Sequence, residues 1–202
     1  MRPGVEHKRA DVHHPVHELV ARRWSPYAFS NRRVDPAALR SLFEAARWAA
    51  SSYDEQPWRW IVATMDDPAG HARLLSCLVE ASQECARQAP VLGLGVASLR
   101  FERTGKDNPA ALHDLGLAAG NLTLEATARG LHVHWMIGIL PDRVREQYAI
   151  PDGFRPLTGF AIGRLGDVDA LPEKLRARDM APRTRKPLAA LVFRGRWGRP
   201  AR

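Results

Sequence analysis

The stretch SSYDEQPWRWIVAT (residues 51–64) joins a predicted helix to a predicted strand. Before it, Asp35 and Pro36 are typical of a helix start, and apolar residues recur at helical spacing as far as residue 50. After the joint, residues 59–66 are rich in Trp, Ile, Val and Thr, as strands are. The joint itself holds two serines, an acidic pair and a Gln-Pro-Trp step, so it is more polar than a plain turn and is a candidate functional loop.

The same patterns divide the rest of the chain into helices and strands. Further helices are predicted at 16–23, 71–89, 113–130 and 142–150. Gly130 is placed to end the helix at 113–130. Further strands are predicted at 90–98, 131–139, 156–166 and 189–197. Helices between most of the strands favour a sheet covered by helices, of the α+β or α/β class. The small residues of helix 113–130 fit close packing against a neighbour such as a second subunit, or they reflect helix propensity alone.

Length and composition fit one globular domain. The chain has 202 residues, 45% hydrophobic and 26% charged, and we expect a flexible arm over 1–15 and a single domain over 16–202 with a basic C-terminal tail. No apolar run reaches the roughly 18 residues of a membrane span, and no signal peptide is visible, so a cytoplasmic protein is expected. Cys77 and Cys85 would lie about 12 Å apart on one helix, too far for a disulfide.

Positive charge gathers at the C-terminus. The net charge is +8 and the isoelectric point about 10.3, and from residue 183 onward the chain has seven Arg and Lys and no Asp or Glu. Such a tail can bind nucleic acid or a membrane surface, or hold a single phosphate. No helix-turn-helix, zinc-finger or aromatic-basic RNA signature accompanies it. We therefore expect neither a nucleic-acid nor a membrane partner.

Three short motifs do not carry the chemistry that they superficially offer. The glycines of GLGVAS (93–98) fall inside a predicted strand, whereas a dinucleotide-binding fingerprint follows a strand and opens a helix. His132 and His134 share one face of a predicted strand, but no third metal ligand stands near them in the sequence, so no metal is expected. Cys85 lies in the middle of a predicted helix, which favours a structural thiol over a nucleophile.

Polar clusters remain in three places: ARRWSPYAF (21–29), the joint, and PRTRKP (182–187). Arginines of the first and third clusters could converge on one phosphate, because the planar guanidinium matches phosphate geometry. They could equally be ordinary surface charge.

The order and spacing of these clusters resemble those of the nitroreductase family of FMN enzymes. The matching stretches are RRWSPYAF (22–29), ASSYDEQPWRWIVA (50–63), GLHVHWMIG (130–138) and RTRKPLAALVFRGRW (183–197), and together they span residues 17–198. The resemblance implies an α+β three-layer sandwich, a mostly antiparallel sheet flanked by helices. It also implies an intertwined homodimer with FMN at the subunit interface and a C-terminal strand added to the partner's sheet.

The resemblance further implies that NADH or NADPH reduces FMN, which then reduces a small acceptor such as a nitroaromatic or quinone. The flavin performs this chemistry, so no catalytic side chain is expected. The positions that match the family's flavin-binding residues are Arg22, Arg23, Ser25, Tyr27, Ser51, Ser52, Asp54, Ser82, Trp135, Met136, Ile137, Gly138, Arg183 and Arg185.

These positions divide by the part of FMN that the resemblance gives them. Arg23, Arg183 and Arg185 would bind the phosphate or its surroundings, and Ser25 the ribityl or phosphate region. The serines and the aspartate of the joint would come from the other subunit and border the isoalloxazine ring. Ser82 stands where an Asn often bonds the pyrimidine edge, and residues 135–138 would line the ring with their backbone N–H groups.

Two residues expected beside the isoalloxazine ring depart from the family pattern. Tyr27 stands where Arg or Lys is usual, and Asp54 stands where Asn is usual. Cys85 and Ile137 also replace charged residues that some members carry. Less positive charge beside the ring predicts a lower flavin reduction potential or slow reduction by NAD(P)H. The alternative function is therefore a flavin-binding sensor or carrier with weak or no reductase activity.

Overall fold

The computed structural model describes residues 6–201, which fold as two compact units. The core unit is Arg23–Met180, and the terminal unit combines the described residues 6–22 with residues 181–201. Within the described residues, no helix combines the length and the apolar character that crossing a membrane requires.

The core unit alternates helices with strands of one sheet. Its elements in chain order are α2 (Pro36–Arg47), β1 (Trp58–Thr64), α3 (Pro68–Leu75), α4 (Glu80–Ala86), β2 (Val91–Ser98), α5 (Ala111–Ala128), β3 (His132–Met136), α6 (Pro141–Tyr148), β4 (Phe154–Gly163) and α7 (Glu173–Met180). The predicted helix start is confirmed, because the Asp35 side chain accepts a hydrogen bond from the Ala37 N–H and Pro36 opens α2. The predicted stop of α5 is also confirmed, with Gly130 at a φ of 67° just beyond its end.

The four strands have the order β1-β2-β4-β3, and every pairing is antiparallel. Trp58 lies opposite Ala97, and Val91 lies opposite Ile162. β2 is central, and all eight of its residues are buried. Of the two classes that the pattern left open, the described residues form the α+β class that the resemblance implies.

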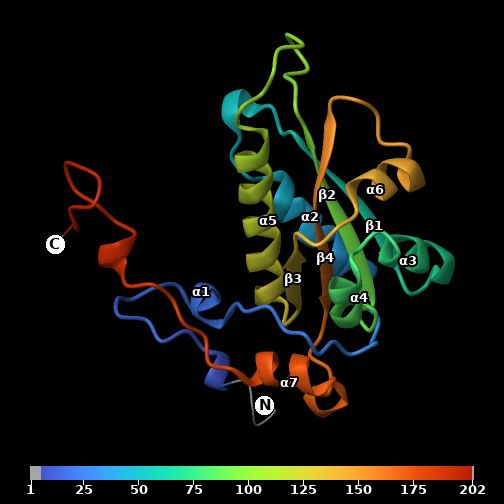
Figure 1. The fold of residues 1–202 in the computed structure, drawn as a ribbon, viewed down its shortest axis with the longest axis horizontal. Coiled ribbons are helices and arrows are strands. Elements are labelled where there is room, and N and C mark those ends of the chain that lie inside the picture. Colours follow the sequence, from blue (N-terminus) through green and yellow to red (C-terminus); the bar gives the residue numbers. More distant parts are fainter. Residues whose placement is uncertain (1–5, 202) are drawn as a thin grey trace. The chain divides into compact units, whose positions relative to one another are not determined.

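Helices cover both faces of the sheet and make three layers (Figure 1). One core joins α2 and α5 to the sheet through residues such as Leu42, Leu122 and Phe160. The other joins α3, α4 and α6 to the opposite face through residues such as Leu74 and Val144. Successive strand residues therefore enter different cores, as the alternation of side chains along a strand requires.

The glycines of β2 make room for aromatic rings. A Cβ on Gly93 would lie 2.0 Å from Cζ of Phe160, and a Cβ on Gly95 would lie 3.0 Å from the Trp60 ring. Phe160 in turn packs against Trp60 and Trp135, with ring centroids 5.9 and 4.8 Å away. The G-x-G pattern therefore serves packing inside a strand, in agreement with its position in the sequence.

The predicted helix over 71–89 is wrong, because the segment divides into α3 and α4. The four residues between them extend alongside the loop that follows β3. The Val79 N–H donates to the Gly138 carbonyl at 3.0 Å, and the Leu140 N–H donates to the Cys77 carbonyl at 2.8 Å. These bonds satisfy backbone groups that a continuous helix would have satisfied internally. Both cysteines are free and buried.

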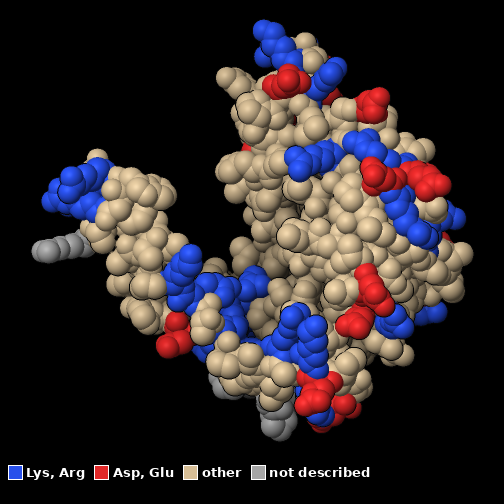
Figure 2. Space-filling model, viewed as in Figure 1, with Lys and Arg blue, Asp and Glu red and all other residues tan. Residues whose placement is uncertain are grey.

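The terminal unit contains α1 (Glu18–Arg22) and a short 3-10 turn at Leu188–Ala190. The predicted strand over 189–197 is wrong. The chain there folds back on itself, with Phe193 bridging to Pro200 and its ring 4.9 Å from that of Trp197. Glycines at 195 and 198 adopt the positive φ that this reversal needs. Figure 2 shows Lys and Arg side chains on this segment, in agreement with the basic residues of its sequence.

Candidate functional site

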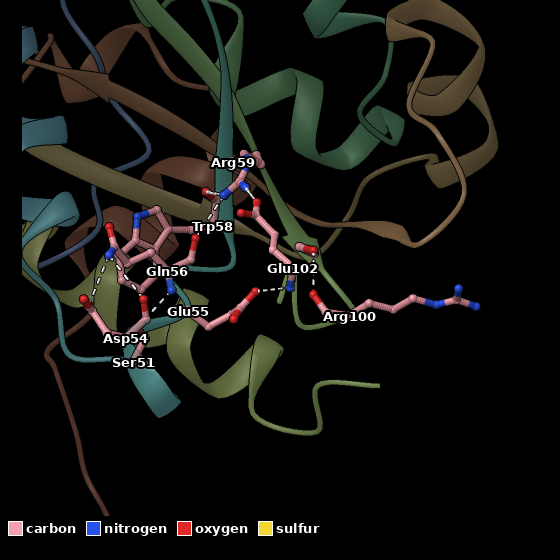
Figure 3. Close-up of polar contacts among 9 residues, drawn as sticks. Ser51, Asp54, Glu55, Gln56, Trp58, Arg59, Arg100 and Glu102 are labelled. Atoms are coloured by element: carbon pink, nitrogen blue, oxygen red, sulfur yellow. Dashed lines mark hydrogen bonds and ion pairs between the residues drawn. The ribbon is translucent and has the colours of Figure 1, made fainter. Parts of the chain in front are cut away.

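The joint after α2 is built from its own polar groups (Figure 3). The Ser51 hydroxyl accepts a hydrogen bond from the Gln56 N–H at 3.0 Å, and the Gln56 side-chain amide donates to the Asp54 carboxyl at 3.1 Å. Tyr53, Asp54 and Gln56 have φ values of 56°, 56° and 50°, in the left-handed region that residues other than glycine seldom adopt. The loop therefore holds a strained shape, and such strain concentrates at functional sites.

A buried carboxyl on α5 anchors this joint. Asp114 is 2% exposed, and its side chain accepts a hydrogen bond from the Ser52 N–H at 3.0 Å. The sequence-based site did not include it. Its signal was an acidic residue among the buried apolar positions of a helix, since Ala111, Leu115 and Ala118 share that face.

The hairpin-like loop between β2 and α5 is tied to the joint (Figure 3). The Glu102 N–H donates to the Glu55 carboxyl, and the Arg59 guanidinium pairs with the Glu102 carboxyl at 2.8 Å. The Tyr53 ring meets the Phe101 ring edge-on at 5.8 Å. A hydrogen bond, an ion pair and a ring contact therefore connect this loop with the joint and the start of β1.

The stretch after β3 packs directly against α4. A Cβ on Gly138 would lie 2.5 Å from the Ser82 hydroxyl oxygen and 2.7 Å from the Val79 side chain, so only glycine fits. The Ile137 side chain beside it is 91% exposed. The structure thus brings together Ser82 and the 136–138 stretch, two parts of the predicted site that lie far apart in the sequence.

The side chains of Trp135 and Met136 point into the two cores. The Trp135 indole N–H donates to the Thr123 hydroxyl at 2.8 Å, beneath α5. The Met136 sulfur lies 3.8 Å from the Cys85 sulfur in the core on the other face. Any contact of these two residues with a ligand would therefore be made by their backbone groups, as the resemblance implied for residues 135–138.

The arginines of the predicted phosphate site are distributed over both units. In the core unit, Arg23 donates to the Ser25 hydroxyl at 3.3 Å, and both are half-buried. In the terminal unit, Arg183 donates to the carbonyls of Lys8 and Ala21, at 2.8 and 2.9 Å. Arg185 is exposed there. Convergence of the two clusters on one phosphate stays a prediction.

Arg22, the remaining arginine of the predicted site, is an exposed residue at the end of α1. Tyr27 is half-buried against the core formed with α3 and α4, and its ring meets the His134 ring edge-on at 4.8 Å. The phenol that replaces the family's usual cation is therefore packed on the protein rather than extended into solvent.

The sequence and the fold were compared with those of known proteins to identify the family. The model of the nitroreductase family matches residues 20–164. The chain belongs to the nitroreductase family. A crystal structure described as an oxidoreductase containing FMN is 35% identical with a TM-score of 0.87, and the match covers 93% of this chain and 95% of that one.

Two further relatives of this nitroreductase-family chain match shorter stretches. An uncharacterised 15.4 kDa protein of Mycolicibacterium smegmatis, from the ask 5′ region, is 40% identical over 99 residues, which is 48% of this chain and 67% of that protein. A Streptomyces coelicolor protein provisionally named NADH dehydrogenase/NAD(P)H nitroreductase is 33% identical over 75 residues. That match spans 37% of this chain and 36% of that protein.

The Cys85 thiol is buried near the C-terminal end of α4 in this nitroreductase-family fold. Burial raises the pKa of its thiol to about 11, so the thiol stays protonated near neutral pH. Its sulfur is directed toward the Ser82 carbonyl and the Met136 sulfur. The structural role expected from its position is consistent with this burial.

Proposed function

We propose that this chain is an FMN-dependent oxidoreductase that takes electrons from NADH or NADPH and passes them to a small acceptor such as a nitroaromatic or quinone. The near full-length likeness to an FMN-containing oxidoreductase carries the proposal. The name of the S. coelicolor relative supports the choice of donor. The flavin supplies the electron and hydride chemistry when bound, and the chain supplies binding, orientation and electrostatics.

The described residues fit FMN. The Arg23 guanidinium and the Ser25 hydroxyl offer phosphate donors on one short segment. Ser82 packs against Gly138, so its hydroxyl lies beside the backbone of the stretch expected to line the ring. Ser82 would meet the polar edge of the ring there.

We propose further that the chain acts as a homodimer that pairs through α5 and the end of α2. On the outer face of α5, Gly116 and Gly120 would meet nothing within 4 Å of an added Cβ, and Leu117 is 40% exposed. Trp48 at the end of α2 is 72% exposed. Apolar side chains beside bare backbone favour a closely packed partner. Sedimentation-equilibrium measurement of the mass tests this, and a monomer at micromolar concentration would contradict it.

The test of the oxidoreductase is an anaerobic titration. The purified protein should be yellow and should release FMN on denaturation. Adding NADH or NADPH without air should bleach the flavin absorbance, and a quinone or nitroaromatic should restore it. A colourless protein that cannot be reconstituted with FMN would refute the flavin function.

A second function is favoured by the residues at positions 27 and 54. A phenol replaces a cation at the first, and an acid replaces an amide at the second, so the chain supplies less positive charge for a reduced flavin. FMN binding without bleaching by either nicotinamide would identify a sensor or carrier instead.

A further inference from the structure

The segment Arg23–Tyr27 is held by a histidine from β3. The His134 Nδ1 lies 2.8 Å from the Pro26 carbonyl oxygen, a distance at which a ring N–H donates to that oxygen. The His134 ring also meets the Tyr27 ring edge-on. Burial lowers the pKa of His134, which keeps the imidazole neutral with one N–H to donate.

A buried acid from α7 holds the N–H of the same peptide group. Asp179 is 5% exposed, and its carboxyl oxygen accepts a hydrogen bond from the Tyr27 N–H at 2.6 Å. The carbonyl and the N–H of the peptide that joins Pro26 to Tyr27 are thus fixed by two side chains from distant parts of the sequence. Buried acids require such a partner, and this one has a backbone group.

The two histidines of β3 face this segment together. The His132 ring meets the Trp24 ring edge-on at 5.6 Å, two residues before the contact of His134 with Pro26. This explains the HVH pattern without a metal, since both imidazoles support the polypeptide that carries Arg23 and Ser25.

We propose that His134 and Asp179 are positioning residues that preorganise the segment Arg23–Tyr27 for the phosphate end of FMN. The inference rests on the proposed function, because it takes Arg23 and Ser25 as phosphate donors. Without the two bonds the segment would sample other shapes in the free protein. FMN would then have to order it, and that cost appears as a weaker apparent affinity.

The experiment is a fluorescence titration of the apoprotein with FMN, because flavin emission is expected to change on binding. His134→Phe keeps a ring against Tyr27 but removes the Nδ1 donor, and His134→Asn restores a donor near that position. Asp179→Leu removes the acceptor, and Asp179→Asn retains an oxygen. Glu173→Ala, at an exposed position of α7, is the control.

We expect the Phe and Leu variants to bind FMN about tenfold or more weakly, as the loss of a partner for a buried polar group implies. The Asn variants should stay within about threefold of the wild type, and Glu173→Ala should match it. Full affinity in His134→Phe, or equal loss in His134→Asn, would overturn the inference. If Asp179→Leu does not fold, the His134 pair still decides.

Two outcomes separate this inference from the function on which it rests. A wild-type apoprotein that binds no FMN refutes the proposed cofactor. Amide exchange in the free protein tests the geometry alone: the Tyr27 N–H should exchange slowly in the wild type and in Asp179→Asn. Rapid exchange of that amide in the wild type would refute the hydrogen bond between the Tyr27 N–H and Asp179, whether or not FMN binds.

Discussion

Replacing Asp114 by Ala should loosen the joint between α2 and β1. The change removes the acceptor of the Ser52 N–H, in a place where the carboxyl is 2% exposed. Loss of a partner for a buried polar group costs about 1–3 kcal/mol. The contact of the carboxyl with His113 adds little, because the His113 side chain is 72% exposed. At about 2–4 °C per kcal/mol for a chain of this size, Tm should fall by roughly 2–12 °C.

Thermal and urea denaturation of the apoprotein measure this effect, and Asp114→Asn separates its causes. The amide keeps an oxygen at the acceptor position, so we expect it to lose about 1 kcal/mol or less. Asp107→Ala is the matched control, since the Asp107 side chain is 96% exposed in a 4.0 Å ion pair with Arg100. If Asp114→Ala is no less stable than this control, or if Asp114→Asn is equally damaging, the anchor is not a hydrogen bond.

Three other changes test the core and the electrostatics. Gly93→Ala should lower the free energy of unfolding in urea by about 1–3 kcal/mol, because the new Cβ would overlap the ring of Phe160. Adding Phe160→Leu should recover part of this loss. Additive effects of the two changes would contradict the overlap. Tyr27→Arg should raise the flavin midpoint potential measured by dye equilibration, by about 30 mV for each 1.4 kcal/mol of stabilisation of the reduced state, and an unmoved potential would refute the charge argument. The folded pKa of His134, which faces Asp179 and Tyr27, lies below the ordinary value of 6.5. Its contribution to stability is therefore complete above pH 6.5 and declines as pH falls below it, and unfolding free energies measured across this range should decline less steeply for His134→Asn.

Local signals in the sequence predicted most of the fold. The Asp35–Pro36 start of α2 and the Gly130 stop of α5 depend on residues beside the boundary, and both are present in the structure. The division of 71–89 depends on backbone bonds to residues 138–140, far away in the sequence, which helical periodicity does not contain. The failed strand at 189–197 has the same origin, since an apolar run is a strand only when another strand pairs with it.

The candidate site was predictable where residue type alone is informative. The family pattern selects Arg23, Ser25 and the serines of the joint as candidates. The structure places Arg23 beside Ser25, and Ser82 against Gly138. The supporting residues were not predictable in this way. Asp114 and Asp179 are acids within helices, and residue type does not distinguish them from exposed acids, whereas their hydrogen bonds with backbone N–H groups do.

The bare outer face of α5 offers a way to detect the association of two copies of the chain, by adding one methyl group there. In a monomer, Gly120→Ala would replace a poor helix former with the best one, at a site where the new Cβ meets no other atom, and would stabilise the helix by about 1 kcal/mol. Against a closely packed second copy, the same methyl group would force two backbones apart and weaken the assembly. The sign of the change in Tm, followed with protein concentration, therefore reports whether this face is covered.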